Sequence, residues 1–89
     1  SPRERLIAPE LNRILQLVVE WVKAKPGDCE SICRLARTKL LEKGFEAVDY
    51  ITVCDSDTLE PVKTYLGNAR VLGAARLGSA RLIDNLSIR

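Results

Sequence analysis

The sequence predicts an α+β fold in which helices pack on a small three-stranded antiparallel sheet. Three observations lead to this prediction. The first half repeats apolar residues at steps of three and four, the period of an amphipathic helix. The second half is rich in β-branched residues and contains a Gly-Ser turn signal, which is typical of strands and a hairpin. The length of 89 residues suits one domain with one small core.

The N-terminal segment predicts a short helix followed by a longer one. Ser1 suits the N-cap, Pro2 the first helical position, and Glu4 the carboxylate position of a capping box. Pro9 lacks an amide proton, so we expect the helix to stop there and restart. The restarted helix covers residues 10–24 and has one apolar face. That face consists of Leu11, Ile14, Leu15, Val18 and Val22.

A third helix is expected between Asp28 and Gly44. Asp28 follows a Lys-Pro-Gly break and is predicted to cap the helix start. Gly44 suits a left-handed cap at the helix end, with Phe45 making the accompanying apolar contact. The expected inner face consists of Ile32, Cys33, Leu35, Ala36, Leu40 and Leu41.

Three strands are expected in the second half, over residues 47–54, 70–77 and 80–86. The first two are separated by a polar break at residues 55–58, which can cap a short helical turn, and by a connection. The small residues Gly73, Ala74 and Ala75 leave room for something packed closely against the second strand.

Composition excludes several classes of protein. The net charge of +2, with both signs mixed along the chain, gives no basic stripe for nucleic acid. No apolar run could span a bilayer, and no secretion signal is recognised, so we expect no membrane partner. The odd count of three cysteines indicates reduced thiols and a cytoplasmic location. Cys29 and Cys33 share a helix face, where core packing is favoured over a metal or redox site.

Residues that could carry chemistry are scarce. There is no histidine, no Gly-rich phosphate loop and no nucleophile elbow. Asp55 and Asp57 could suggest a magnesium site, but a turn cap is the favoured interpretation. We therefore expect no catalytic, cofactor-binding or metal-binding residue in this chain.

The hairpin offers the least ordinary group, Arg81, Asp84 and Asn85, among apolar residues. One interpretation is an ion pair and turn caps at a strand end. The other is a polar edge that faces another domain or a phosphate-bearing ligand, for which an arginine fork is suited.

Residues 77–85 resemble the closing signature of pantothenate synthetases, Leu-Gly-x-x-Arg-Leu-Ile-Asp-Asn. Three further segments are similar to this family in the same order. These are residues 1–5 with 7–9, residues 42–45, and residues 49–50 with 55–59. The resemblance thus extends over essentially the whole chain, and four ordered matches are far more specific than one short motif.

The resemblance implies an enzyme that uses ATP and Mg²⁺ to join pantoate and β-alanine through a pantoyl-adenylate, releasing AMP and pyrophosphate. Its first domain is a Rossmann-like nucleotide-binding domain, which also forms the homodimer. Residues 1–89 would be the C-terminal lid domain, with helices on a three-stranded sheet. Its partner would be the N-terminal catalytic domain of the same enzyme, and Arg81, Asp84 and Asn85 are the candidate interdomain or lid contacts.

The family's catalytic motifs, of the His-x-Gly-His and Ser-Ser-Arg-Asn types, are absent from these 89 residues. The resemblance therefore assigns no catalytic or ATP-binding residue here, and we expect the chain alone to be inactive and to bind no cofactor. The parent could be a plain synthetase or a fusion with another enzyme, such as a cytidylate kinase.

Two rival interpretations stay open. One is a free-standing interaction domain with the same fold, which would dock through the small-residue strand. The other is a nucleic-acid-binding module that uses Arg76, Arg81 and Arg89, which the small net charge disfavours.

Overall fold

Two layers, one of helices and one of strands, make up the computed structural model, which describes all residues from Ser1 to Arg89. The predicted α+β class, with helices on a three-stranded antiparallel sheet, is confirmed. The elements in chain order are α1 (Pro2–Ile7), α2 (Glu10–Ala24), α3 (Cys29–Lys43), β1 (Ala47–Asp55), β2 (Ala69–Leu77) and β3 (Ala80–Ile88).

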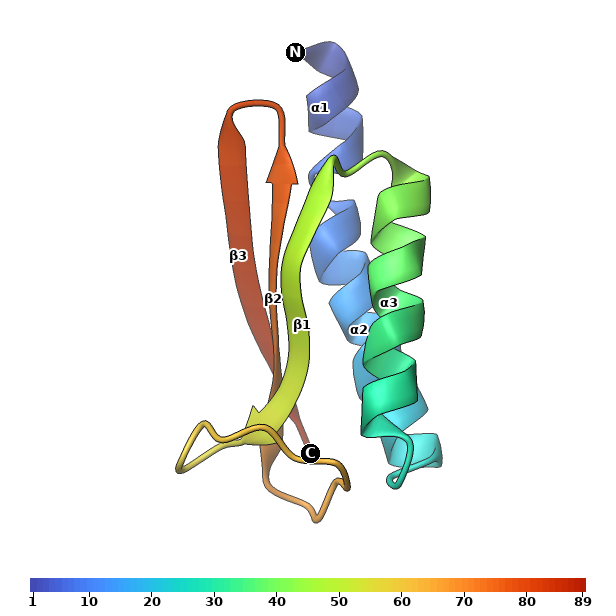
Figure 1. The fold of residues 1–89 in the computed structure, drawn as a ribbon, viewed down its shortest axis with the longest axis vertical. Coiled ribbons are helices and arrows are strands. Elements are labelled where there is room, and N and C mark those ends of the chain that lie inside the picture. The colour runs from blue at the N-terminus through green and yellow to red at the C-terminus, as the bar shows by residue number, and fades with distance from the viewer.

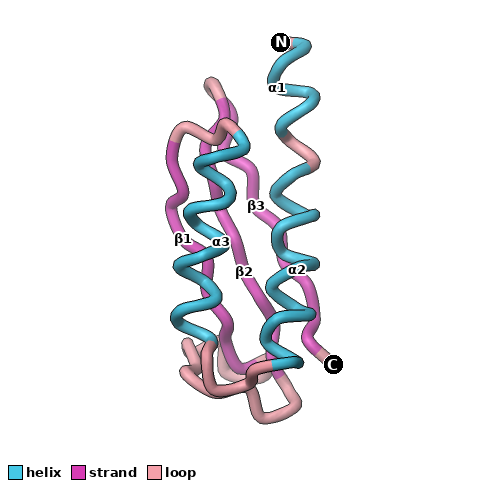
Figure 2. Tube along the Cα trace, turned by 90° about the vertical axis from the view of Figure 1, so that its right-hand side faces the viewer, coloured by secondary structure: helices cyan, strands magenta, loops and turns pink.

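The sheet has the order β1-β2-β3, with both pairs antiparallel. Helices α2 and α3 lie side by side on one face of it and leave the other face uncovered (Figure 1). α1 continues nearly along the line of α2 (Figure 2). The N-terminus and the β2–β3 hairpin lie at one end of the long axis, whereas the C-terminus and the β1–β2 connection lie near the other. None of the helices has the length and apolar character of a membrane span.

The predicted start of α1 is confirmed in detail. The Ser1 hydroxyl accepts a hydrogen bond from the Glu4 N–H, and Glu4 returns a contact to the Ser1 backbone, which completes a capping box. At Pro9 the chain stays in the right-handed helical region, and its carbonyl accepts from the Arg13 N–H at 3.3 Å. The proline therefore divides the helix, as expected, without turning the chain aside.

The core lies between α2, α3 and the inner face of the sheet. All five residues predicted for the inner face of α2 are buried. For α3 the prediction is wrong in part, because Leu35 and Leu41 are 46% and 45% exposed. The buried residues of this helix form a narrow stripe, and the half-buried Cys33 packs against the core beside it. The stripe consists of Cys29, Ile32, Ala36 and Leu40.

Of the two caps predicted for α3, the one at its end is confirmed and the one at its start is wrong. Gly44 has a φ of +117° and donates to Leu41, while the Phe45 N–H donates to Leu40, the pattern of a Schellman motif. Asp28, in contrast, makes no side-chain cap. Its backbone, with a ψ of 25°, lies outside the extended region that N-cap residues use, so its carboxylate cannot reach the first N–H groups.

β1 contains a bulge that sequence alternation did not reveal. Val48 pairs with Ala75 and Tyr50 with Ala74, so Asp49 is an extra residue without a partner. Strict alternation would place Val48 on the opposite face from Ile51 and Val53. The bulge resolves this conflict, and all three side chains pack toward the helices.

Two glycines of β2 and its hairpin are required by their surroundings. A methyl group on Gly73 would come within 2.9 Å of Ile51 and 3.1 Å of Leu15, so this glycine permits the close approach of α2 that the small residues predicted. Gly78, with a φ of +60°, opens the two-residue turn between β2 and β3.

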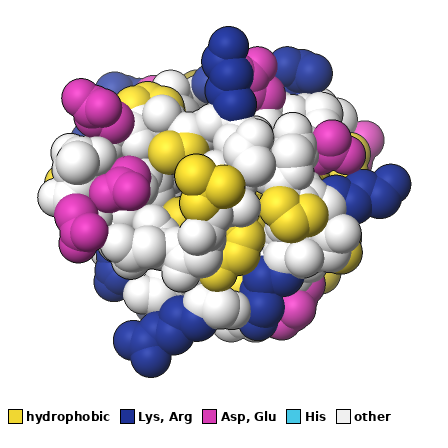
Figure 3. All heavy atoms as spheres, turned by 90° about the horizontal axis from the view of Figure 1, so that it is seen from below, with side chains coloured by type: hydrophobic (Ala, Val, Ile, Leu, Met, Phe, Trp, Pro, Cys, Tyr) yellow, Lys and Arg dark blue, Asp and Glu magenta, His cyan; other side chains and the backbone are white.

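The connection between β1 and β2 closes the far end of the molecule. Asp55 Oδ1 accepts from the N–H groups of Asp57 and Thr58 at 2.8 and 3.0 Å, which confirms the capping interpretation. The turn does not continue into a helix. Seen from this end, apolar side chains gather in the middle of the surface, with charged ones around them (Figure 3). The connection contributes the exposed residues Leu59 and Leu66.

Candidate functional site

The three hairpin residues predicted as candidate contacts all lie on β3, but they do not form one group. Arg81 and Asn85 lie on the uncovered face of the sheet. Asp84 faces α2, where its carboxylate accepts a hydrogen bond from the Asn12 side chain at 2.9 Å. The period-two alternation of a strand could have separated Asp84 from the other two. The neighbouring apolar residues Leu82 and Ile83 obscured which face is the inner one.

Arg81 belongs instead to a cluster of three charges on the uncovered face. Arg76 and Arg81 are directly opposite each other on β2 and β3. Asp49 reaches both from the bulge of β1, at 3.2 Å from Arg76 Nε and 2.6 Å from Arg81 Nε. Two like charges in a cross-strand pair repel, so one carboxylate between them makes the pair tolerable.

The Asp49 carboxylate and the two guanidinium groups of this cluster affect one another. Hydrogen bonds from Arg81 and Arg76 lower the pKa of the Asp49 carboxyl below its ordinary value. Each arginine uses its Nε on Asp49. The terminal guanidinium nitrogens remain available to an anionic partner, which is the geometry expected of a polar contact surface.

The same sheet face carries apolar side chains beside the charged cluster. Across its middle, Tyr50, Ala74 and Ile83 are register neighbours on the three strands. Ile83 is 61% exposed, although it is a large apolar residue. Arg70 and Ser87, joined by a hydrogen bond of 2.9 Å, lie nearer the far end of this face. The face thus combines an apolar middle with arginines toward both ends.

The cysteines act as packing residues. All three are free thiols, and Cys29 and Cys54 are buried. Burial raises the pKa of Cys33 to about 11, so its thiolate is scarce at neutral pH. No three His, Cys, Asp or Glu side chains come together as a metal-binding group would require.

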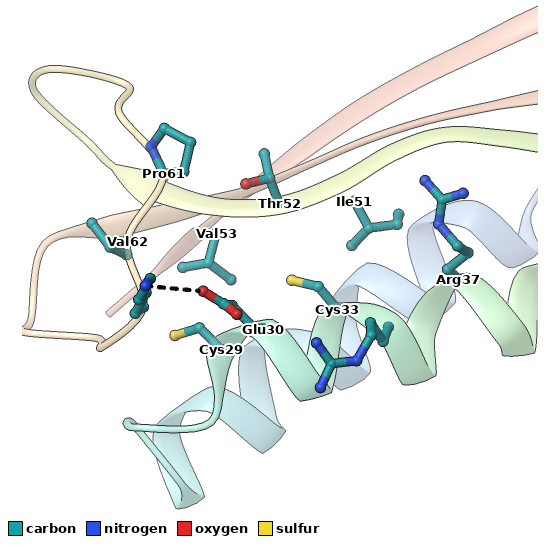
Figure 4. A pocket seen from close by; sticks show the side chains of 11 residues that line it. Cys29, Glu30, Cys33, Arg37, Ile51, Thr52, Val53, Pro61 and Val62 are labelled. Carbon is teal, nitrogen blue, oxygen red and sulfur yellow. Dashed lines mark ion pairs between the residues drawn. The ribbon is translucent and has the colours of Figure 1, made fainter.

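A groove of about 390 Å³ separates α3 from β1 (Figure 4). Cys33, Ile51 and Val53 give it an apolar lining, while Arg34 and Arg37 line it from α3. Sequence reasoning missed this feature. No local pattern could have indicated it, because it depends on how far α3 lies from the edge of the sheet.

Comparison with known proteins gives a consistent result. The model of the family described as pantoate-beta-alanine ligase matches residues 1–87. The chain is 40% identical over 88 residues to a pantothenate synthetase from Rhizorhabdus wittichii, covering 99% of this chain and 31% of that protein. It is 41% identical over 86 residues to a pantoate–beta-alanine ligase from Schizosaccharomyces pombe, covering 97% of this chain and 30% of that protein.

Solved structures agree. A crystal structure of pantothenate synthetase from Thermus thermophilus superposes with a TM-score of 0.83 at 33% sequence identity. The alignment covers 99% of this chain and 32% of that one. The chain thus spans about a third of the length of the relatives it matches.

Proposed function

Since this chain belongs to the pantoate-beta-alanine ligase family, we propose that it is the C-terminal lid domain of a pantothenate synthetase. The supporting observation is that nearly all of the chain matches while only 31% of the bacterial relative is covered. A compact fold of this kind corresponds to one domain of the enzyme. The whole enzyme would join pantoate and β-alanine with ATP and Mg²⁺, through a pantoyl-adenylate, to give pantothenate, AMP and pyrophosphate.

In this proposal the chemistry belongs to an N-terminal domain, which would also form the homodimer. ATP and Mg²⁺ would be held there, since the family's Ser-Ser-Arg-Asn and His-x-Gly-His motifs are absent from these 89 residues. The three free cysteines support a cytoplasmic location for the enzyme.

The part played by this chain would be to exclude water. An acyl-adenylate is readily hydrolysed, and a domain that closes over it protects it until the amine attacks. We expect closure as a rigid body, with a hinge ahead of Ser1. The hairpin tip and the N-terminus share one end of the molecule, and the Gly78 N–H donates to Glu46 at 3.2 Å. Gly78 also lies against the Glu4 side chain of α1, so the tip would move with α1 and with the connection that follows α3.

Two of the predicted contacts, Arg81 and Asn85, lie on the uncovered sheet face and remain candidates for contact with the catalytic domain. Asp84 is half-buried against α2. Its role would be to hold β3 in place, and contact with the catalytic domain is a weaker candidate role for it.

The proposal is tested by comparing the full-length enzyme with a version that ends just before Ser1. We expect the truncated enzyme to release AMP without forming pantothenate, because adenylate is lost to water, and to turn over more slowly. Equal AMP release and equal turnover in both proteins would show that this domain is no lid. The coding DNA ahead of Ser1 should encode Ser-Ser-Arg-Asn nearby and His-x-Gly-His further upstream.

A free-standing interaction domain is the second candidate. Its predicted docking strand is wrong, because Gly73, Ala74 and Ala75 are buried. The candidate is favoured instead by the exposed Ile83 on the uncovered sheet face. A start codon or an unrelated domain directly ahead of Ser1 would support this candidate over the lid.

A further inference from the structure

We propose that the groove between α3 and β1 binds an extended acidic peptide, which adds to the sheet as a fourth strand beside β1. This interaction does not depend on the proposed lid function. It rests on the edge of the sheet, on the apolar lining of the groove, and on two arginines without carboxylate partners.

β1 is an edge strand, because the sheet order is β1-β2-β3. Part of its free edge is already paired with the connection that follows it. The Val62 N–H donates to the Val53 carbonyl, and the Asp55 N–H donates to the Glu60 carbonyl, both at 2.9 Å. These bonds show that the edge accepts an additional antiparallel strand.

The covered stretch ends before the middle of β1. In an antiparallel strand, alternate residues direct their N–H and C=O groups to the same side. Val53 directs its carbonyl outward, so Ile51 directs its backbone groups outward too. The paired segment does not reach Ile51. An exposed pair of backbone groups is a template for a further strand.

The groove beside this edge has a lining suited to alternate side chains of such a strand. Cys33, Ile51 and Val53 form its apolar part, and Val62 closes one end (Figure 4). A strand directs every second side chain to the same face. Small β-branched side chains of the peptide would therefore fit against this lining.

The charges around the groove favour an acidic peptide. Arg34, Arg37 and Lys63 line it, against one carboxylate, Glu30. Glu30 pairs with Lys63 at 3.9 Å, while neither Arg34 nor Arg37 takes part in any ion pair of the structure. With three cations and one carboxylate, the lining carries a net charge of +2, which equals the net charge of the whole chain.

The test uses the 89-residue chain and a fluorescein-labelled probe of alternating glutamate and valine, six residues long, measured by fluorescence anisotropy. We expect saturable binding, and we expect the double variant Arg34→Glu/Arg37→Glu to weaken it by at least about tenfold. The double variant Arg3→Glu/Arg5→Glu, which makes the same total charge change on α1, should leave the affinity within about twofold. Circular dichroism confirms that each variant is folded.

Strand addition is separated from simple anion binding by two further probes. A peptide with N-methyl groups at its central valines should lose binding, because it cannot form the backbone hydrogen bonds. Amide hydrogen exchange at Ile51 should slow when the unmodified probe is bound. Equal binding of the N-methylated probe, competition by free glutarate alone, or no binding at 1 mM (roughly the weakest affinity of a specific contact) would each overturn the proposal.

Discussion

At the scale of single residues, the Asp49 side chain determines how charges are arranged on the uncovered face of the sheet. It lies in a bulge, reaches two arginines on two other strands, and allows them to face each other. Without the bulge, alternation would direct Asp49 into the helix-covered face. The cluster therefore depends on the backbone irregularity as much as on the three side chains.

We predict that Asp49→Asn lowers the urea midpoint of unfolding at pH 7, because the two arginines then repel without a carboxylate between them. The folded-state pKa of Asp49 is lowered. Its stabilising effect is therefore complete above the unfolded value of about 4 and is lost as the pH falls through the folded value. The difference between wild type and variant should shrink below about pH 4, and also in high salt.

The control for this measurement is Glu20→Gln, which removes an exposed carboxylate that has no ion pair. It should leave the midpoint unchanged at every pH. A constant difference between Asp49→Asn and wild type down to pH 2 would show that the charges are not responsible.

At the scale of elements, the sequence was informative where the signals are local. The apolar period placed α2 and its buried face, the capping box placed the start of α1, and Gly44 placed the end of α3. The strands extend one or two residues beyond their predicted ends, because pairing with neighbours carries a strand past its own pattern.

Features that depend on distant parts of the chain could not be predicted. Leu35 and Leu41 satisfy helical periodicity, yet only the position of α3 over the sheet decides that they remain exposed. The bulge at Asp49 follows from the register with β2. The same holds for the candidate site. Arg81 could be identified from its local motif, whereas its partners Asp49 and Arg76 come from other strands and could not be predicted.

The contact between α2 and β2 leads to the next prediction, which concerns Gly73. We expect Gly73→Ala to destabilise the fold by about 1–2 kcal/mol, because the added methyl meets Ile51 and Leu15 in a packed core. Urea denaturation measures this loss. Gly27→Ala is the matched control, since a methyl there meets nothing within 4 Å, and it should be neutral or slightly stabilising. Similar effects at both positions would contradict the close approach.

At the scale of the whole molecule, the proposed lid leaves nucleotide binding and catalysis to another domain of the enzyme. We therefore predict that calorimetric titration of the 89-residue chain with ATP and Mg²⁺ gives no measurable heat of binding. No AMP should form when pantoate is added. Micromolar affinity for ATP would contradict the assignment of nucleotide binding to another domain. The full-length enzyme provides the positive control.

If the domain closes as the proposed lid, the positions of its two termini decide which end moves furthest. They lie near opposite ends of a molecule whose longest extent is 40 Å (Figure 1). If the pivot is ahead of Ser1, a closing rotation of about 15° would carry the far end through roughly 10 Å. A fluorophore attached beside Arg89 would therefore report the motion with the greatest amplitude. Energy transfer to a second dye on the catalytic domain should change when both substrates are bound. A constant energy-transfer signal would contradict the closing rotation.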